Sequence, residues 1–189
     1  MTPTVQKGVS FLQNGQYDEA IAVFLEVLYD DPRDAEALKN LGIAYTEVGR
    51  NSESEKTLNY YLSLYPDDAA AVEGLGCALY RQRAYYKAYE HFERSRKLNP
   101  GSPSIHRNLG LAQMAVGQVE EGYKNLKRAH QMNLFDYKTA YAFAAACQKS
   151  GRIDEAEEVL TELLQAYLPE EFESTVRHDL EALRRSRFR

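Results

Sequence analysis

The chain has 189 residues, of which 44% are hydrophobic and 27% are charged, and its formal net charge is -5. This composition is typical of a soluble folded protein and excludes an intrinsically disordered one, and the length suffices for one domain or one short solenoid. The two cysteines, Cys77 and Cys147, exclude a disulfide scaffold, and they do not form the C-x-x-C spacing of metal or redox sites.

The charges are distributed unevenly along the chain. Residues 1–68 carry 5 Lys and Arg against 12 Asp and Glu, residues 69–136 carry 10 against 6, and residues 137–189 carry 8 against 10. A protein that binds duplex nucleic acid usually has a dominant basic face, so we expect no nucleic-acid partner. The opposite signs of the first two segments leave head-to-tail association into a homo-oligomer open as an alternative.

The sequence contains no membrane-spanning or secretory signal. No apolar run approaches the roughly 18 residues needed to cross a bilayer. Residues 1–8 lack the basic and apolar regions of a secretory signal. We therefore expect a cytoplasmic protein without a transmembrane segment. A leader removed ahead of residue 1 and a peripheral membrane association stay open as alternatives.

A 34-residue period runs through the chain from its first residues. Prolines and glycines mark it at Pro32, Pro66 and Pro100, at Gly8, Gly42, Gly76 and Gly110, and at Gly15, Gly49, Gly117 and Gly151, with Arg83 as the exception in the last series. In the same frame small residues recur at Ala20, Ser54, Ala88, Gly122 and Ala156, and large apolar residues at Phe24, Leu58, Phe92, Leu126 and Leu160. Such agreement in one frame indicates a repeat architecture.

Each repeat unit is expected to contain two helices. In chain order the units are 1–34, 35–68, 69–102, 103–136 and 137–170. In the second unit Leu38, Leu41, Gly42 and Tyr45 lie at i, i+3, i+4 and i+7, which is one face of a helix, and Gly49 ends that helix. The second helices open with acidic pairs, which suit a helix N-terminus, and close near X-Pro steps.

This pattern resembles the tetratricopeptide repeat family, which has a 34-residue period, small residues at repeat positions 8 and 20, and proline at position 32. The resemblance covers nearly the whole chain. It implies an all-α fold, a right-handed superhelical solenoid of five helix-turn-helix repeats. The chain departs from the family pattern at position 4, where the usual tryptophan is missing throughout. It also departs in the fourth unit, at Gln113 and at the missing closing proline.

Residues 170–189 do not continue the repeat. Phe172, Val176, Leu180 and Leu183 lie on one helical face, which predicts a C-terminal capping helix over the last repeat. The helix is followed by a basic tail, Arg184 to Arg189. The tail fits an anionic contact, with a membrane surface, the acidic half of a neighbouring subunit or an RNA. Alternatively, it is a solvated helix end whose arginines complement the helix dipole.

In the family that the chain resembles, the first helices line a concave groove that receives a peptide or a helix of a partner. Carrying the groove positions over predicts a partner-binding set of Lys39, Asn40, Ile43, Glu73, Cys77, Tyr80, Arg81, Arg107, Asn108, Leu111, Met114, Lys138 and Tyr141. Further groove positions are Glu36, Thr46, Glu47, Gln148 and Lys149.

Two features of this set indicate how a partner is recognised. Asn40 and Asn108 occupy the position where asparagine amides in some family members hydrogen-bond the backbone of an extended ligand. The alternative is that asparagine has no role there. The cations Arg81, Arg107 and Lys138 stand beside apolar groove residues, and this mixture suits an acidic-hydrophobic segment. The alternative is a solvated basic face.

The carboxylate clamp by which some family members hold chaperone C-termini is absent. Val5 and Val9 stand where the clamp needs Lys and Asn, and in the later window Glu73 would repel a carboxylate. The four histidines have no metal-ligand spacing, and there is no phosphate-binding loop or nucleophile elbow. We therefore expect no enzyme activity, no metal and no cofactor.

The sequence thus predicts a non-catalytic scaffold or adaptor that binds a partner peptide or helix and assembles a multiprotein complex. Three alternatives stay open. One is a self-assembling bacterial organelle scaffold, since Lys7-Gly8-Val9-Ser10 and Leu41-Gly42-Ile43-Ala44-Tyr45 are similar to the magnetosome-associated proteins of the MamA type. The others are a small secretion chaperone and the targeting domain of a larger enzyme.

Overall fold

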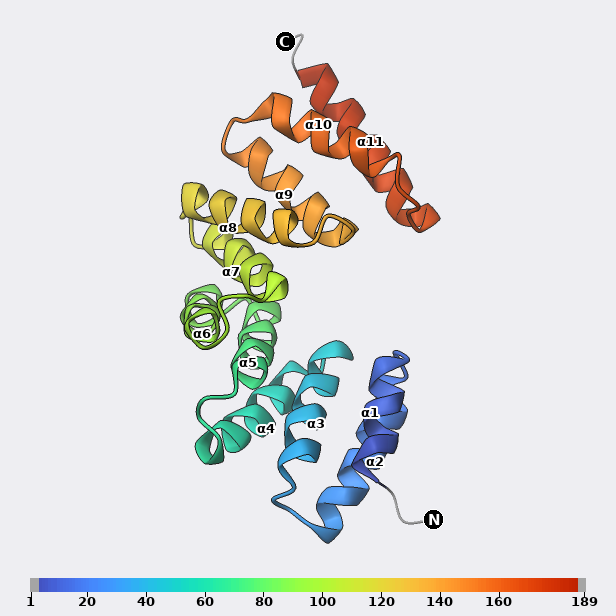
Figure 1. The fold of residues 1–189 in the computed structure, drawn as a ribbon, viewed down its shortest axis with the longest axis vertical. Coiled ribbons are helices and arrows are strands. Elements are labelled where there is room, and N and C mark those ends of the chain that lie inside the picture. The colour runs from blue at the N-terminus through green and yellow to red at the C-terminus, as the bar shows by residue number, and fades with distance from the viewer. Residues whose placement is uncertain (1–3, 187–189) are drawn as a thin grey trace. The chain divides into compact units, whose positions relative to one another are not determined.

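The computed structural model describes residues 4–186, and within that range the chain forms eleven helices and no strand. The prediction of an all-α chain is therefore confirmed for the described residues. The chain divides into two compact units, Met1–Pro100 and Gly101–Arg189, here called unit 1 and unit 2. Figure 1 shows the helices of each unit in chain order.

Unit 1 consists of helical hairpins packed one on the next. They are α1 (Val5–Gln13) with α2 (Tyr17–Asp30), α3 (Ala35–Glu47) with α4 (Asn51–Leu64), and α5 (Ala69–Arg81) with α6 (Tyr85–Leu98). Helix α2 packs against α3 and α4 against α5, while α1 also contacts α3 and α3 contacts α5. The first helices of successive hairpins therefore lie side by side, and the surface of α1, α3 and α5 is called the unit-1 face.

Unit 2 repeats this arrangement and adds one helix. Its hairpins are α7 (Pro103–Ala115) with α8 (Val119–Met132) and α9 (Tyr137–Lys149) with α10 (Ile153–Leu163), followed by α11 (Glu170–Ser186). Helix α8 packs against α9, α7 contacts α9, and α11 packs against α10. The surface of α7, α9 and α11 is called the unit-2 face. Of the predicted tail, residues 187–189 lie outside the described residues.

Helix α11 has the amphipathic stripe that the sequence predicts. Val176, Leu180 and Leu183 are buried in one apolar cluster with residues of α9 and α10, and Phe172 packs at the edge of that cluster. Its first turn carries acidic residues and its last turn carries Arg184 and Arg185, which suits the helix dipole. The apolar end of unit 2 is thereby covered.

The two helices of a hairpin approach each other at glycines of the 34-residue series. A Cβ atom added to Gly76 would lie 2.6 Å from Cε1 of Phe92, and one added to Gly110 would lie 2.7 Å from Cγ of Leu126. Non-bonded carbon atoms normally approach to about 3.5–4.0 Å, so a side chain at these positions would force the helices apart. The large and small residues of the repeat pattern are thus complementary partners within one hairpin.

The turn between the helices of a hairpin requires a left-handed backbone. Gly49 has a φ of 79°, as expected from its place in the repeat frame. In the α5–α6 turn the same conformation falls on Arg83, with a φ of 63°. Because the Cβ of an L-residue is crowded in this conformation, Arg83 is a strained exception.

Candidate peptide-binding faces

On the unit-1 face the cation of Lys39 is used inside the fold. Lys39 Nζ donates to Asp68 Oδ2 at 3.1 Å, and the hydroxyl of Tyr61 donates to the same oxygen at 2.8 Å. The other carboxylate oxygen of Asp68 accepts from the amides of Ala70 and Ala71 and caps the N-terminus of α5. This cluster joins α3, α4 and α5.

A second contact joins the opposite ends of α3 and α5. The guanidinium of Arg81 donates to the carbonyl oxygens of Thr46 and Glu47, and it also lies 3.5 Å from the Glu47 carboxylate. The last carbonyls of a helix have no partner within that helix, so a cation placed there satisfies them and complements the helix dipole. Arg81 therefore fixes the C-terminus of α3.

Unit 2 contains the same two contacts at the corresponding repeat positions. Arg107 Nη1 donates to Asp136 Oδ2 at 3.0 Å, and Asp136 caps α9. Lys149 Nζ donates to the carbonyl oxygen of Met114 at 2.9 Å, near the C-terminus of α7. In each unit a basic residue thus pairs with a capping aspartate at one end of the first helices, and a cation caps a helix C-terminus at the other end. These contacts are called the inter-hairpin clamps.

The carboxylates of the clamps are held in their ionised form. Burial opposes ionisation of Asp68, but hydrogen bonds from the Ala71 amide, Tyr61 and Lys39 outweigh it and lower the pKa of the carboxyl group. Burial likewise opposes ionisation of Asp136, and hydrogen bonds from Thr139 together with the charge of Arg107 lower its pKa. Both carboxylates are therefore negative partners at neutral pH.

Asn40 is the predicted recognition residue that has an available side chain. It lines an open cavity of about 410 Å³ together with Val9 of α1, Ala35, Glu36 and Lys39 of α3, and Tyr61 of α4. Within residues 4–186 the carboxamide of Asn40 makes no hydrogen bond, and its side chain is half-buried. An amide in this setting can both donate to and accept from a peptide backbone.

The other predicted residues of unit 1 have partial exposure and existing contacts. Ile43 is half-buried beside Gly74. Glu73 and Cys77 are half-buried, and each already interacts with another group. The ring of Tyr80 packs edge-on against Tyr85, with centroids 5.1 Å apart, and burial raises the pKa of its hydroxyl.

On the unit-2 face the predicted residues differ widely in accessibility. Asn108 accepts from Arg107 Nε at 3.5 Å, Met114 is buried, and Leu111 packs at the edge of the core. Lys138 is exposed, with its ammonium 5.9 Å from the ring centroid of Tyr137.

Tyr141, also predicted for the groove, is covered by α11. Its hydroxyl donates to Asp179 Oδ2 at 2.5 Å, and its ring packs edge-on against Phe172. Burial, followed by the hydrogen bond to Asp179, raises its pKa to about 12. Tyr141 thus connects α9 to the capping helix.

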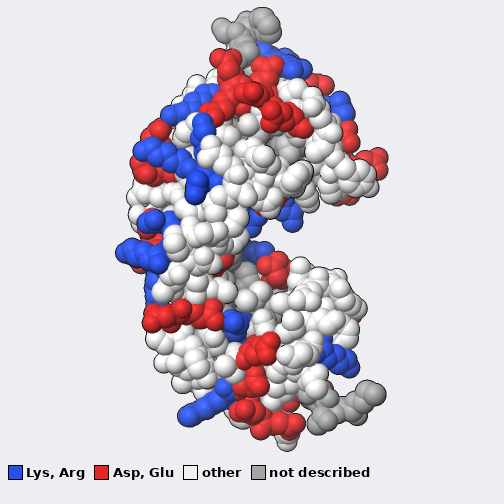
Figure 2. Space-filling view, viewed as in Figure 1, with Lys and Arg blue, Asp and Glu red and all other residues white. Residues whose placement is uncertain are grey.

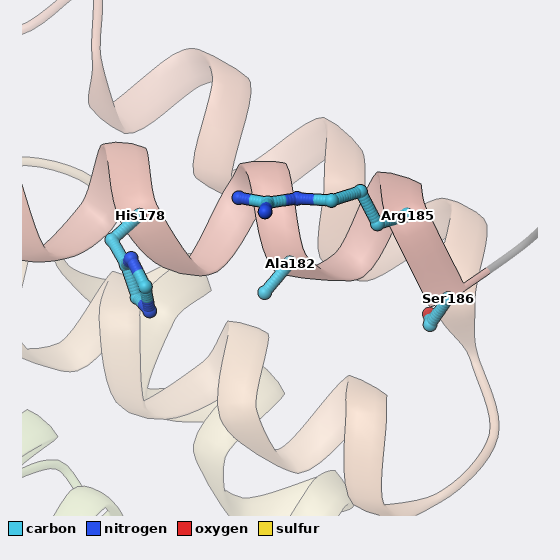
Figure 3. Close-up of a pocket in the computed structure, with 4 residues that line it drawn as sticks. All are labelled: His178, Ala182, Arg185 and Ser186. Carbon is cyan, nitrogen blue, oxygen red and sulfur yellow. The ribbon is translucent and has the colours of Figure 1, made fainter.

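Helix α11 adds residues to the unit-2 face that the sequence reading assigned only to a cap. A cavity of about 440 Å³ is lined by His178, Ala182, Arg185 and Ser186. Figure 3 shows His178, Ala182 and Ser186 along one side of α11, with the Arg185 side chain running back along the helix toward His178. A neighbouring cavity of about 390 Å³ shares Ala182 and Ser186 and reaches Gln148 of α9.

A sequence signal for this surface was present. His178, Ala182 and Arg185 recur at i, i+4 and i+7, which is one helical face, and they alternate with the buried stripe that contains Leu180 and Leu183. The small side chain of Ala182 lies between His178 and Arg185 in this series.

Two segments of the sequence match models of a known repeat family. Residues 11–75 match a model described as a tetratricopeptide repeat, and residues 139–171 match a second model of the same description. Together the two matches span more than half of the chain. The chain belongs to the tetratricopeptide repeat family.

Relatives of this tetratricopeptide chain include much longer proteins. The Hsp70-Hsp90 organising protein of Plasmodium falciparum is 28% identical over 102 residues, which are 54% of this chain and 40% of that protein. The matched segments cover between 18% and 40% of the length of the curated relatives, so the chain spans less than half of each of them.

Solved structures agree on the fold. A thermophilic tetratricopeptide protein of Thermus thermophilus superposes with a TM-score of 0.75 at 22% identity, covering 95% of this chain and 96% of that one. MamA of Desulfovibrio magneticus RS-1 superposes with a TM-score of 0.71 at 21% identity, covering 85% and 90%. The predicted tetratricopeptide-type fold is confirmed, and so is the similarity to MamA at the level of the fold.

The described residues contain no candidate metal site. Within residues 4–186 no group of three or more His, Cys, Asp and Glu side chains is placed to hold a metal ion. The Cys147 thiol is buried, and burial followed by the charge of Glu155 raises its pKa to about 12, so it stays protonated. Among the described helices none is long and apolar enough to cross a membrane.

Proposed function

We propose that this tetratricopeptide chain is a non-catalytic scaffold or adaptor that holds an extended segment of a partner protein on the unit-1 face. The observation that carries the proposal is the carboxamide of Asn40, which lines an open cavity and makes no hydrogen bond within residues 4–186. Solvent reaches this half-buried amide, and a peptide backbone supplies both a donor and an acceptor that can take the place of water.

The inter-hairpin clamps support recognition of backbone rather than of charge on this face. Lys39 and Arg81 are both held by groups of the fold, so an acidic ligand would have to compete with Asp68 and with the α3 carbonyls. Asn40 needs no such exchange. The partner segment on the unit-1 face is therefore expected to be bound largely independently of its side-chain charge.

The unit-2 face is the better candidate for an acidic-hydrophobic segment. Arg107 is paired with Asp136, but Lys138 on α9 and His178 and Arg185 on α11 have exposed side chains. Arg185 donates to the Glu181 carbonyl oxygen at 3.3 Å and forms a solvent-exposed ion pair with the Glu181 carboxylate at 3.2 Å, which contributes little. A ligand carboxylate can replace such a pair at small cost.

The family relationship supports partner binding but leaves the partner to be identified. The Plasmodium falciparum relative is by its name an organiser of Hsp70 and Hsp90, and this chain lacks the residues of a carboxylate clamp at Val5, Val9 and Glu73. We therefore propose a partner other than a chaperone C-terminus. We also propose a cytoplasmic location. For the repeats we propose the bounds 1–34, 35–68, 69–102, 103–136 and 137–170, with residues 170–189 as the cap.

The test compares Asn40→Ala with Asn59→Ala, since Asn59 is exposed on α4, away from the unit-1 face. Partners are captured from the source lysate on wild-type and variant chains and quantified by mass spectrometry. Loss of one net hydrogen bond to the ligand lowers recovery about tenfold for Asn40→Ala, and Asn59→Ala leaves it unchanged. Equal recovery on all three chains, at equal melting temperature, would show that the unit-1 face is the wrong surface.

A further inference from the structure

One edge of unit 2 exposes aromatic side chains from two loops. Phe135, in the loop between α8 and α9, is 98% exposed, and Tyr167, in the loop between α10 and α11, is 101% exposed. Leu134, next to Phe135, is 64% exposed. Large apolar side chains so fully exposed on neighbouring loops are typical of an interaction site. These three residues are called the apolar edge.

The two loops lie side by side around a shared cavity. A cavity of about 70 Å³ is lined by Leu134 from the first loop, by Ala166 from the second, and by Val159 and Leu163 of α10. A cavity that holds a whole benzene ring measures about 150 Å³, so this one accepts the edge of a ring rather than all of it. Phe135 and Tyr167 are each adjacent in sequence to a residue that lines this cavity.

The surroundings of the apolar edge are acidic. Glu162 lines the cavity, and Glu170 and Glu171 begin α11 three residues after Tyr167. All three are exposed, and within residues 4–186 none of them forms an ion pair. Figure 2 shows acidic side chains at the tip of unit 2 where α11 begins. A complementary ligand therefore combines an aromatic or aliphatic anchor with positive charge.

The chain itself contains a segment of this chemistry. Residues 187–189 read Arg-Phe-Arg and follow directly on α11. We propose that Phe188 of one molecule docks on the apolar edge of a second copy, with Arg187 and Arg189 facing the acidic surroundings. The ring then packs against an exposed ring of the apolar edge, where edge-on or offset aromatic contacts are favourable.

The same contact cannot form within one molecule. Helix α11 has 17 residues, which at a rise of about 1.5 Å per residue make it about 25 Å long. The α10–α11 loop lies at the start of α11 (Figure 1), and residues 187–189 come after its last residue in the sequence. Three residues, even fully extended, span at most about 10 Å, which is less than the length of α11. In the proposed contact between copies, the residues that follow α11 of one molecule bind at the loop that precedes α11 of the next molecule.

The test uses a fluorescent peptide of residues 182–189 and, as receptor, the full chain with Phe188→Ala, so that the receptor's own tail does not compete. Anisotropy titration is expected to show saturable binding that weakens about threefold or more between 50 and 300 mM NaCl. The receptor variant Phe135→Ser/Tyr167→Ser, and separately the peptide with Phe188→Ala, is expected to weaken binding at least tenfold. Tyr29→Ser is the matched control, because Tyr29 is 87% exposed on α2.

Sedimentation of the full chain gives an independent readout. The wild type is expected to show a mass that rises with concentration, and Phe188→Ala a constant monomer mass. Since Phe135 and Tyr167 are almost fully exposed, their replacement leaves the melting temperature unchanged. The proposal is overturned if the peptide shows no binding at millimolar receptor, if Tyr29→Ser weakens binding as much as the edge variant, or if the wild type is monomeric throughout.

Discussion

Two glycines of α5 allow the packing argument to be tested with one substitution at two positions. Gly74 and Gly76 lie in the same helix, and each can be replaced by alanine. A Cβ at Gly74 would lie 3.3 Å from Leu58 Cδ1 and 3.5 Å from Ile43 Cγ1, which neighbouring methyl groups can accommodate. A Cβ at Gly76 would lie 2.6, 2.8 and 3.1 Å from three atoms of the Phe92 ring, which is 1% exposed.

The two variants are expected to change stability in opposite directions. Replacing glycine by alanine inside a helix raises the free energy of unfolding by about 1 kcal/mol through helix propensity, and this gain is the same at both positions. At Gly74 the small steric cost leaves a net gain of about 0.5–1 kcal/mol. At Gly76 the Phe92 ring must retreat by about 1 Å in a packed core, which costs about 3 kcal/mol and leaves a net loss of about 2 kcal/mol.

The assay is urea unfolding followed by far-ultraviolet circular dichroism and by tyrosine fluorescence. Both variants have the same composition, so effects on the unfolded chain nearly cancel, and the difference reports on the native state. We expect free energies of unfolding that differ by about 2–3 kcal/mol, or melting temperatures that differ by about 5–10 °C. Equal midpoints, or a Gly76→Ala variant more stable than Gly74→Ala, would refute the close approach of α5 and α6.

Three further predictions concern the turn and the helix caps. Arg83→Gly should stabilise the chain by about 0.5–1 kcal/mol in urea unfolding, because it relieves a left-handed backbone at some cost in unfolded-chain entropy; a loss would mean that the turn is unstrained. Asp136→Ala should lower the free energy of unfolding by about 2–3 kcal/mol and Asp34→Ala by about 1 kcal/mol. Both aspartates cap a helix, but Asp136 also pairs with the half-buried Arg107. Equal losses for the two variants would contradict the role of the Arg107–Asp136 pair. Because folding lowers the pKa values of Asp68 and Asp136, their contribution to the free energy of unfolding is complete above about pH 5. It declines as the pH falls below about 4 toward the lowered folded pKa values, and a urea midpoint independent of pH from 7 to 3 would argue against it.

The fold could be predicted from the sequence because its determinants are local and repeated. The spacing of Leu38, Leu41, Gly42 and Tyr45 defines one helical face, and all four residues are buried. The glycine register predicts the turns, and its one exception, Arg83, adopts the same left-handed conformation. Periodicity gives both the face and the end of a helix, and stacking of the hairpins follows from them.

The site could be predicted only in part, because the repeat frame assigns a residue to a face but not to a partner. Lys39 and Arg107 fall on the predicted faces, yet each pairs with an aspartate 29 residues later in the chain. The repeated separation, a basic residue at position 5 and an aspartate at position 34, was readable in the sequence. Exposure was not readable: nothing local distinguishes the open amide of Asn40 from that of Asn108, which Arg107 contacts.

The inter-hairpin clamps change how mutagenesis of this protein has to be interpreted. A charge-reversal or alanine scan of the first helices would damage the architecture at Lys39, Arg81, Arg107 and Lys149, and a pull-down alone would record that damage as lost affinity. Asn40 and Arg185 are the informative positions, because their replacement is expected to leave the melting temperature unchanged. For a solenoid with such clamps, the melting temperature of each variant has to be measured by calorimetry beside its affinity before a residue is assigned to an interface.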